Sequence, residues 1–167
     1  MPLDIDRPAP NVLVVTRRFR APPERVYDAH VDPALIPRWM KGYGGWSMPV
    51  CINDARPGGT MRYEWREDAT GKGFHITGEF IELDPPRRIV HVERMHLGPD
   101  FSAGGPDPTP DNRCETVFEP DGAGGTRMTL TMTLPDEAAL DAMLATGMTD
   151  GMETTYAALD ALAAEAA

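Results

Sequence analysis

Apolar residues recur every three or four positions along the C-terminal end of the chain, which places them on one side of a helix. A stripe of this length has to be covered by another part of the chain. A glycine inside a helix costs about 1 kcal/mol relative to alanine, so we expect a break near Gly147. The prediction is a short helix over 136–146 and a longer one over 150–165, which Asp150 and Glu153 begin as a capping box. The stripe consists of Leu140, Leu144, Met148, Met152, Tyr156, Leu159, Ala163 and Ala166.

Alternation of apolar and polar residues, the pattern of half-buried strands, dominates the chain between Trp46 and Leu134. Turns rich in glycine, proline and aspartate separate the segments. A further strand is expected over 11–19, after a tail at 1–10, and two short helices follow it, the second over 33–40. The expected strands of the middle region are 46–54, 60–67, 74–84, 87–96, 113–119 and 126–134.

This order of elements predicts an α+β fold in which a helix covers an antiparallel sheet. A chain of 167 residues is long enough to bury most of its apolar surface in one core. We therefore expect a single domain over 11–167.

The alternation also predicts which residues face the helix. In one strand, Met61, Tyr63 and Trp65 share a side while the other side is wholly charged, so the aromatic side is the buried one. Counting across the hairpin turns gives the partners expected on this inner face. They are Trp65 with Ile76, Tyr63 with Gly78, Met61 with Phe80, Phe80 with His91, Gly78 with Glu93, Ile76 with Met95, Cys114 with Met132, Thr116 with Leu130, and Phe118 with Met128.

His91 and Glu93 are the candidate functional residues, because this count places an imidazole and a carboxylate close together on an apolar face. A buried ionisable group needs a partner or water. A few polar groups in a mostly apolar lining are typical of a ligand cavity. Two alternatives stay open: a register slip of one residue turns both side chains to solvent, and a satisfied pair can simply bond to one another or to the hydroxyl of Tyr63.

Net charge argues against two classes of partner. The charge of -10 and the isoelectric point near 4.7 disfavour nucleic acid and anionic membranes, since both attract a basic surface. The N-terminus lacks the basic and apolar regions of a signal peptide, and no apolar run reaches membrane-spanning length. A cytoplasmic location is therefore expected.

The cysteines and the remaining histidines give little sign of a metal site. Cys51 and Cys114 lie far apart, so each is interpreted as a buried structural thiol, and no metal or cofactor is expected. His75 and His96 can pair across strands on the outer face, which alone is weak evidence for a metal. His30 is interpreted as a solvated helix residue.

Several stretches together carry a resemblance to a known family. They are 21–29 (APPERVYDA), 32–40, 56–59 (RPGG), 78–83 with 85–87, 125–130 (GTRMTL), 146–148 and 150–152. In this combination the chain, from about Val12 onward, resembles the activator-of-Hsp90-ATPase homologues (AHSA1-like proteins) of the SRPBCC, or START and Bet v 1-like, helix-grip superfamily. The resemblance implies a curved antiparallel sheet of six to seven strands around the long C-terminal helix, with a cavity between them. This chain departs from the family at Trp39-Met40-Lys41-Gly42, where members commonly carry two tryptophans and a Gly-Pro.

The resemblance implies no common catalytic residues, because the superfamily includes carriers, cyclases and co-chaperones. The first hypothesis is a binding protein for a small hydrophobic molecule whose polar end is oriented by His91 and Glu93. The expected ligand-binding residues are Tyr63, Trp65, Phe80, His91, Glu93, Thr116, Phe118, Met132, Met148, Met152 and Tyr156.

Two further functions stay open. In an enzyme, His91 acts as general acid or base and Glu93 sets its tautomer. A binding protein is favoured over an enzyme, because the sequence carries no activated nucleophile, metal set or phosphate loop. The family name also implies a module that binds a chaperone, and a homodimer stays open as well.

Overall fold

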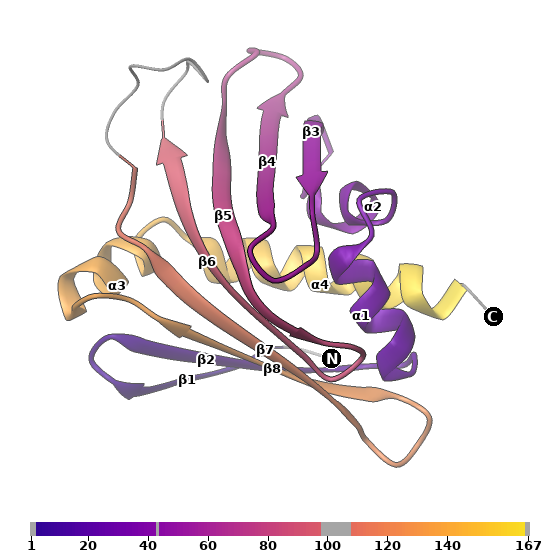
Figure 1. The fold of residues 1–167 in the computed structure, drawn as a ribbon. Coiled ribbons are helices and arrows are strands. Elements are labelled where there is room, and N and C mark those ends of the chain that lie inside the picture. The colour runs from indigo at the N-terminus through magenta and orange to yellow at the C-terminus, as the bar shows by residue number, and fades with distance from the viewer. Residues whose placement is uncertain (1–2, 43, 98–107, 166–167) are drawn as a thin grey trace.

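In the computed structural model, which describes residues 3–42, 44–97 and 108–165, eight strands form one antiparallel sheet. The sheet is curved, and the long C-terminal helix runs across it (Figure 1). The predicted α+β fold is therefore confirmed. The strands are β1 (Asp4–Ala9), β2 (Val12–Phe19), β3 (Trp46–Asn53), β4 (Thr60–Glu67), β5 (Gly73–Asp84), β6 (Arg88–Leu97), β7 (Asn112–Pro120) and β8 (Thr126–Thr133), in the spatial order β1-β2-β8-β7-β6-β5-β4-β3. The helices are α1 (Pro23–Val31), α2 (Ile36–Met40), α3 (Glu137–Leu144) and α4 (Met148–Glu165).

Strand β1 is absent from the sequence prediction, which gives a tail at 1–10 and six to seven strands in the sheet. Asp4–Ala9 instead pairs with β2 at one edge of the sheet. The alternation here is limited to Leu3 and Ile5, too short to indicate a strand, and the segment contains Pro8; both features hide a strand from a periodicity analysis. An edge strand tolerates them, because it is hydrogen-bonded on one side only.

The two short helices predicted after the first strand are confirmed as α1 and α2. Proline at the start of α1 suits the first helical turn, where its missing N–H has no partner to lose. Trp39 holds the two helices together, since its indole N–H donates to the carbonyl of Ala29 at 2.9 Å. The Trp39 ring also packs on Tyr156 of α4.

The break predicted near Gly147 is confirmed, and Gly147 has the left-handed φ of +78° that suits glycine. Asp136 caps α3 by accepting from the backbone N–H of Ala139 at 2.8 Å. The predicted capping box is wrong, because α4 begins before Asp150. Glu153 instead accepts from the backbone N–H of Leu3 at 2.8 Å, which ties the start of α4 to the segment before β1.

The register of the β4–β5 hairpin differs from the prediction by two residues. The turn is tighter than expected, since Glu67 N–H donates to the carbonyl of Lys72 at 2.8 Å. A shift of two leaves every side chain on its predicted face, because side chains alternate with a period of two. The observed pairs are Trp65 with Phe74, Tyr63 with Ile76, and Met61 with Gly78.

The predicted registers of the other two hairpins are confirmed on the inner face. An irregularity between Phe80 and Glu82 changes the partners of the residues nearest the β5–β6 turn. The rest of that hairpin pairs as expected. The confirmed pairs are Phe80 with His91, Gly78 with Glu93, Ile76 with Met95, Cys114 with Met132, Thr116 with Leu130, and Phe118 with Met128.

Helix α4 covers the sheet unevenly. In its second half, Tyr156, Leu159 and Ala163 are buried. In its first half, Met148 and Met152 are only half-buried, although they lie on the same side one and two turns before Tyr156. The core is therefore closely packed under the second half of α4 and incompletely covered under the first.

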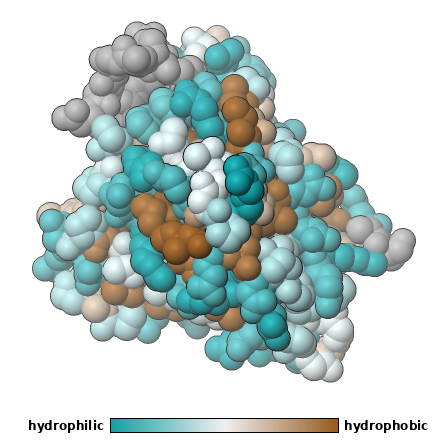
Figure 2. All heavy atoms as spheres, in the orientation of Figure 1, coloured by the Kyte–Doolittle hydropathy of each residue, from teal (hydrophilic) through white to brown (hydrophobic). Residues whose placement is uncertain are grey.

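The outer side of the molecule seen in Figure 2 is mostly polar, with apolar atoms in separate patches. Large apolar side chains exposed among the described residues are Ile5, Ile52 and Ile81. Within the described part of the chain, no helix is both long and apolar enough to cross a membrane.

Candidate functional site

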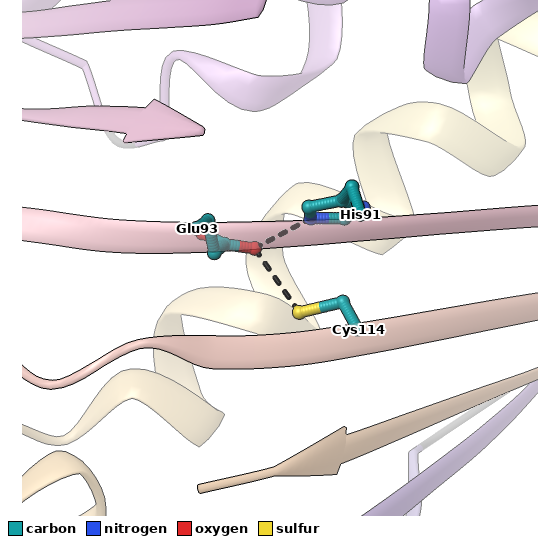
Figure 3. A group of neighbouring side chains, drawn as sticks. All are labelled: His91, Glu93 and Cys114. Carbon is teal, nitrogen blue, oxygen red and sulfur yellow. Dashed lines mark hydrogen bonds and ion pairs between the residues drawn. The ribbon is translucent and has the colours of Figure 1, made fainter. Parts of the chain in front are cut away.

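Four polar side chains form a compact group on the inner face of β6 and β7, which we call the polar array. His91 lies opposite Cys114, and Glu93 lies opposite Asn112. Directly opposed residues of antiparallel strands point to the same face, so the four side chains are neighbours. Figure 3 shows Glu93 bonded to both His91 on its own strand and Cys114 on the next.

Glu93 holds the array together. Its Oε1 accepts a hydrogen bond from His91 Nε2 at 2.8 Å and another from the Cys114 thiol at 3.2 Å (Figure 3). The side chains of His91 and Glu93 are 16% and 24% exposed, so solvent reaches them. Cys114 is 1% exposed. The array is thus a hydrogen-bonded group in an apolar lining, with its imidazole and carboxylate partly accessible and its thiol buried.

The array favours an ionised Glu93 and a protonated Cys114. Burial alone raises the pKa of Glu93, but the hydrogen bond and charge of His91, together with the Cys114 thiol, outweigh it and leave that pKa below its usual value. Burial, and then the negative charge of Glu93, raise the pKa of the Cys114 thiol well above its usual value. Cys114 is therefore poorly suited to act as a free nucleophile.

Gly78 makes room for the array on the neighbouring strand. It lies opposite Glu93, and a Cβ at this position falls 2.4 Å from the carbonyl oxygen of Val92 and 3.2 Å from Glu93 Cα. A side chain here therefore collides with the backbone of β6. Only glycine, which has no Cβ, fits this position without a shift of the backbone.

His30 faces the interior, so its interpretation as a solvated residue is wrong. Its ring lies edge-on to Phe118 with centroids 5.0 Å apart and beside Trp39 at 5.1 Å. Burial lowers the pKa of His30 to about 4; a hydrogen bond to Val26 opposes this shift, and the charge of His91 adds to it. The sequence did carry a signal, because His30 lies one helical turn after the buried Val26.

Two buried imidazole nitrogens, His91 Nδ1 and His30 Nε2, have no hydrogen-bond partner among the described residues. His30 Nδ1 lies 2.7 Å from the carbonyl of Val26, so it carries the proton and Nε2 is an acceptor. His91 uses Nε2 toward Glu93, which leaves Nδ1 for another group. Asn112 Oδ1 is a third unpartnered atom, on the array itself. The interior therefore offers polar atoms that a bound molecule, ion or water can satisfy.

Eight of the eleven predicted ligand-binding residues lie on strands β4 to β8, and Met148, Met152 and Tyr156 lie on α4. The hydroxyl of Tyr63 donates to Asn53, and the indole of Trp65 donates to the carbonyl of Met40 at 2.9 Å. The pair His91 and Glu93 therefore bond to one another and not to Tyr63. The buried residues of the set are Tyr63, Trp65, Phe80, Thr116, Phe118, Met132 and Tyr156, and the half-buried ones are His91, Glu93, Met148 and Met152.

Arg17 is a further interior group that sequence reasoning missed. It lies opposite Met128 on the inner face, is 4% exposed, and its Nε has no partner among the described residues. The guanidinium lies 5.0 Å from the Phe19 ring centroid. Burial, then the charges of Cys114 and Glu93, raise the pKa of the Tyr156 phenol, and Arg17 opposes the rise. Tyr156 therefore experiences the charges of both Arg17 and the array.

The histidines of the outer face pair as the sequence suggests. His75 lies opposite His96, and their rings stack with centroids 4.3 Å apart. His96 Nε2 also lies 2.9 Å from the hydroxyl of Thr77.

A separate hollow lies near the β2 end of the sheet, between Arg18, Arg20, Asp121 and Asp160. Arg20 and Asp160 form an ion pair at 2.9 Å there. None of the predicted ligand-binding residues lines this hollow, so it is not the predicted cavity. A cavity between the sheet and α4 stays a prediction.

Comparison with known proteins places the chain among structures of the same fold. Residues 20–164 match the family model of the Activator of Hsp90 ATPase homolog 1-like proteins. A protein from Rhodobacter sphaeroides is 28% identical, with a TM-score of 0.85 over 99% of both chains. A protein from Mycobacterium smegmatis is 23% identical, with a TM-score of 0.80 over 96% of both chains. The AHSA1-like protein from Aeromonas hydrophila is 18% identical, with a TM-score of 0.66 over 89% of this chain and 93% of that one. No curated protein matches the sequence.

Proposed function

The chain belongs to the Activator of Hsp90 ATPase homolog 1-like family, and from this premise we propose that it binds a small, mostly apolar molecule between the sheet and the first half of α4. The observation that carries the proposal is the incomplete cover of the inner face beside a polar array. Met148 and Met152 are half-buried there, and so is Ile76 on the inner face of β5. Methionine side chains adapt to ligands of different shapes, which suits them to such a surface.

The polar end of the ligand is assigned to His91. Its Nδ1 is buried and unpartnered, while Glu93 fixes the ring by accepting from Nε2. A neutral imidazole held this way presents an acceptor at Nδ1. The ionised Glu93 beside it repels anions, so the proposed ligand carries a hydroxyl or an N–H group and not a carboxylate.

Binding of a neutral fluorescent amine, N-phenyl-1-naphthylamine, tests this proposal. Its emission rises in an apolar site, and its N–H can donate to His91 Nδ1. We expect saturable binding that is lost in Met152→Trp, because the larger side chain fills the uncovered region. Ala157→Trp is the matched control, since Ala157 is exposed on the same helix. Equal binding by both variants, or no binding by the unaltered protein, contradicts the proposal.

Native mass spectrometry of protein isolated from its own host, followed by organic extraction, identifies the natural ligand. A discrete co-purifying molecule that is absent from the His91→Ala, Glu93→Ala double variant supports the assignment of the polar end. The same molecule retained by the variant contradicts that assignment.

An acid–base enzyme is the second candidate, and the same pair of residues favours it. Glu93 orients the imidazole of His91 and leaves the other ring nitrogen available for proton transfer. Solvent deuterium exchange at the α-carbon of bound carbonyl compounds tests this chemistry. We expect a pH-dependent exchange that His91→Ala abolishes and Cys114→Ala retains.

A co-chaperone role stays a prediction from the family name. A pull-down at moderate salt that recovers stoichiometric chaperone supports it.

A further inference from the structure

We propose that the polar array binds one divalent transition-metal ion of the Zn²⁺ class through His91 Nε2, Glu93 Oε1 and Cys114 Sγ. One ligand atom from each of these three residues lies within 4.8 Å of the other two. An imidazole nitrogen, a carboxylate oxygen and a thiolate are the donors that Zn²⁺ takes in proteins. The inference goes beyond the proposed function, because the ion is a different ligand with its own test. While the ion is bound, His91 Nδ1 carries the proton and does not accept from the apolar molecule.

Two of the three separations between the donor atoms need to lengthen by only a fraction of an ångström. Glu93 Oε1 now lies 2.8 Å from His91 Nε2 and 3.2 Å from Cys114 Sγ, as hydrogen-bond partners. Tetrahedral coordination at ordinary bond lengths separates oxygen from nitrogen by about 3.4 Å and oxygen from sulfur by about 3.6 Å. Rotation of the Glu93 and His91 side chains, which are 24% and 16% exposed, adjusts these separations. Both side chains keep some accessible surface, so neither is sealed by close packing.

Ion binding replaces protons with a cation and buries no net charge. Glu93 is already ionised, and the Cys114 thiol releases its proton to solvent as its sulfur binds the ion. His91 frees Nε2 by carrying its remaining proton on Nδ1. One divalent ion with one thiolate and one carboxylate is neutral, which avoids the cost of an unpaired buried charge. Because at least one proton leaves, the affinity rises with pH.

The surroundings provide an outer partner for the metal-bound imidazole. Once Nε2 binds the ion, His91 Nδ1–H needs an acceptor, and metal-bound histidines commonly have one. His30 Nε2 is a buried, unpartnered acceptor whose own Nδ1–H is held by Val26. The charge of His91 acts on the pKa of His30, so the two rings lie within electrostatic range, and we assign His30 Nε2 as the acceptor, directly or through one water molecule.

Asn112 places a further oxygen beside the site. It lies opposite Glu93, and its Oδ1 is buried without a partner among the described residues. Its side-chain nitrogen lies 3.8 Å from the sulfur of Met143. Asn112 Oδ1 or a water molecule takes the fourth position, so the three-residue site can remain open to an exogenous ligand.

Titration with Co²⁺, a coloured substitute for Zn²⁺, tests the proposal on the full chain, reduced and freed of metal by a chelator. We expect one Co²⁺ per chain, with thiolate-to-cobalt absorption in the near ultraviolet that Zn²⁺ abolishes by competition. Cys114→Ser removes this absorption, whereas Cys51→Ser retains it. Cys51 is a suitable matched control, because it is the other thiol of the chain and lies on β3, opposite Tyr63.

Two further variants keep the test decisive if Cys114→Ser does not fold. Glu93→Gln preserves the shape of the side chain, and we expect it to weaken binding more than about 100-fold, since even outer partners change metal affinity 10- to 100-fold. His30→Phe keeps the ring and removes the acceptor, so about a 10-fold loss is expected. Absence of the thiolate band in the unaltered protein, a band lost with Cys51 but not with Cys114, or unchanged affinity in Glu93→Gln overturns the proposal.

Discussion

The indole of Trp39 lies nearly parallel to the ring of Tyr156, with centroids 5.9 Å apart and an angle of 19° between the planes. Both side chains are buried, at 3% and 7% exposure. Phe19 meets Tyr156 edge-on from the sheet, with centroids 5.9 Å apart. The second half of α4 is therefore fixed by α2 on one side and by the sheet on the other.

Removal of this aromatic contact is expected to destabilise the protein. Trp39→Ala leaves a cavity and an unpaired Ala29 carbonyl, so the free energy of unfolding should fall by about 3–5 kcal/mol. Urea denaturation followed by circular dichroism measures the change. Trp46→Ala is the control. Because Trp46 is only half-buried, its removal should lower the free energy of unfolding by less. Equal losses for the two variants contradict the anchoring role of Trp39.

Gly78 should not tolerate a side chain. Gly78→Ala places its Cβ 2.4 Å from the carbonyl oxygen of Val92, and we expect a loss of about 1–3 kcal/mol in the free energy of unfolding. Gly151 is the matched control, since a Cβ there meets nothing within 4 Å. Gly151→Ala should stabilise α4 by up to about 1 kcal/mol. Thermal unfolding of both variants measures the two changes. An unchanged stability of Gly78→Ala contradicts the close approach of β5 to β6 at this position.

His30 makes stability depend on pH. Its pKa is lowered from 6.5 to about 4 in the folded protein, so only the unfolded chain binds a proton between these values. The neutral His30 therefore contributes to the free energy of unfolding. This contribution is fully present above about pH 6.5 and is lost as the pH falls toward 4, by at most about 3 kcal/mol. Denaturant titrations between pH 7.5 and pH 5 measure it. The lowered pKa of Glu93 adds its own loss only below this range.

His30→Phe is the control for this pH dependence. It should flatten the curve between pH 5 and pH 6.5. A smaller slope should remain, because the pKa values of His75 and His96 are also lowered, in both cases chiefly by burial. An identical pH dependence in the variant and the unaltered protein rules out the assignment to His30.

The two thiols should react at different rates. Cys51 is half-buried, whereas Cys114 is 1% exposed and its pKa is raised well above the usual value. A disulfide reagent at pH 8 should therefore modify Cys51 in the folded protein and Cys114 only after unfolding. Cys51→Ser should abolish the fast phase. Two fast phases in the unaltered protein are incompatible with the burial of Cys114.

Local patterns were sufficient to predict most of the fold. The helical stripe predicted α4, Gly147 predicted the break before it, and alternation predicted the inner face of each hairpin. Prediction failed where local pattern and tertiary pairing diverge. The charged, proline-containing β1 forms because β2 offers it an edge, and no periodicity signals that.

The candidate site was predicted in part, for a similar reason. His91 and Glu93 could be placed by counting across one short turn. Cys114 and Asn112 could not be joined to them, because β6 ends at Leu97 and β7 begins only at Asn112, and so wide a separation gives no register to count. The role of His30 depends on how α1 packs against the sheet, which its own sequence does not specify.

The N-terminal strand pair limits where the chain can be shortened. The family match begins at residue 20, beyond both β1 and β2. An expression fragment cut to 20–164 lacks Leu13, Val15 and Phe19 from the core, and it exposes the whole hydrogen-bonding edge of β8. It also loses the bond from Leu3 to Glu153 that ties down the start of α4. Such a fragment should aggregate, so recombinant work on this protein needs the residues that precede the recognisable family segment.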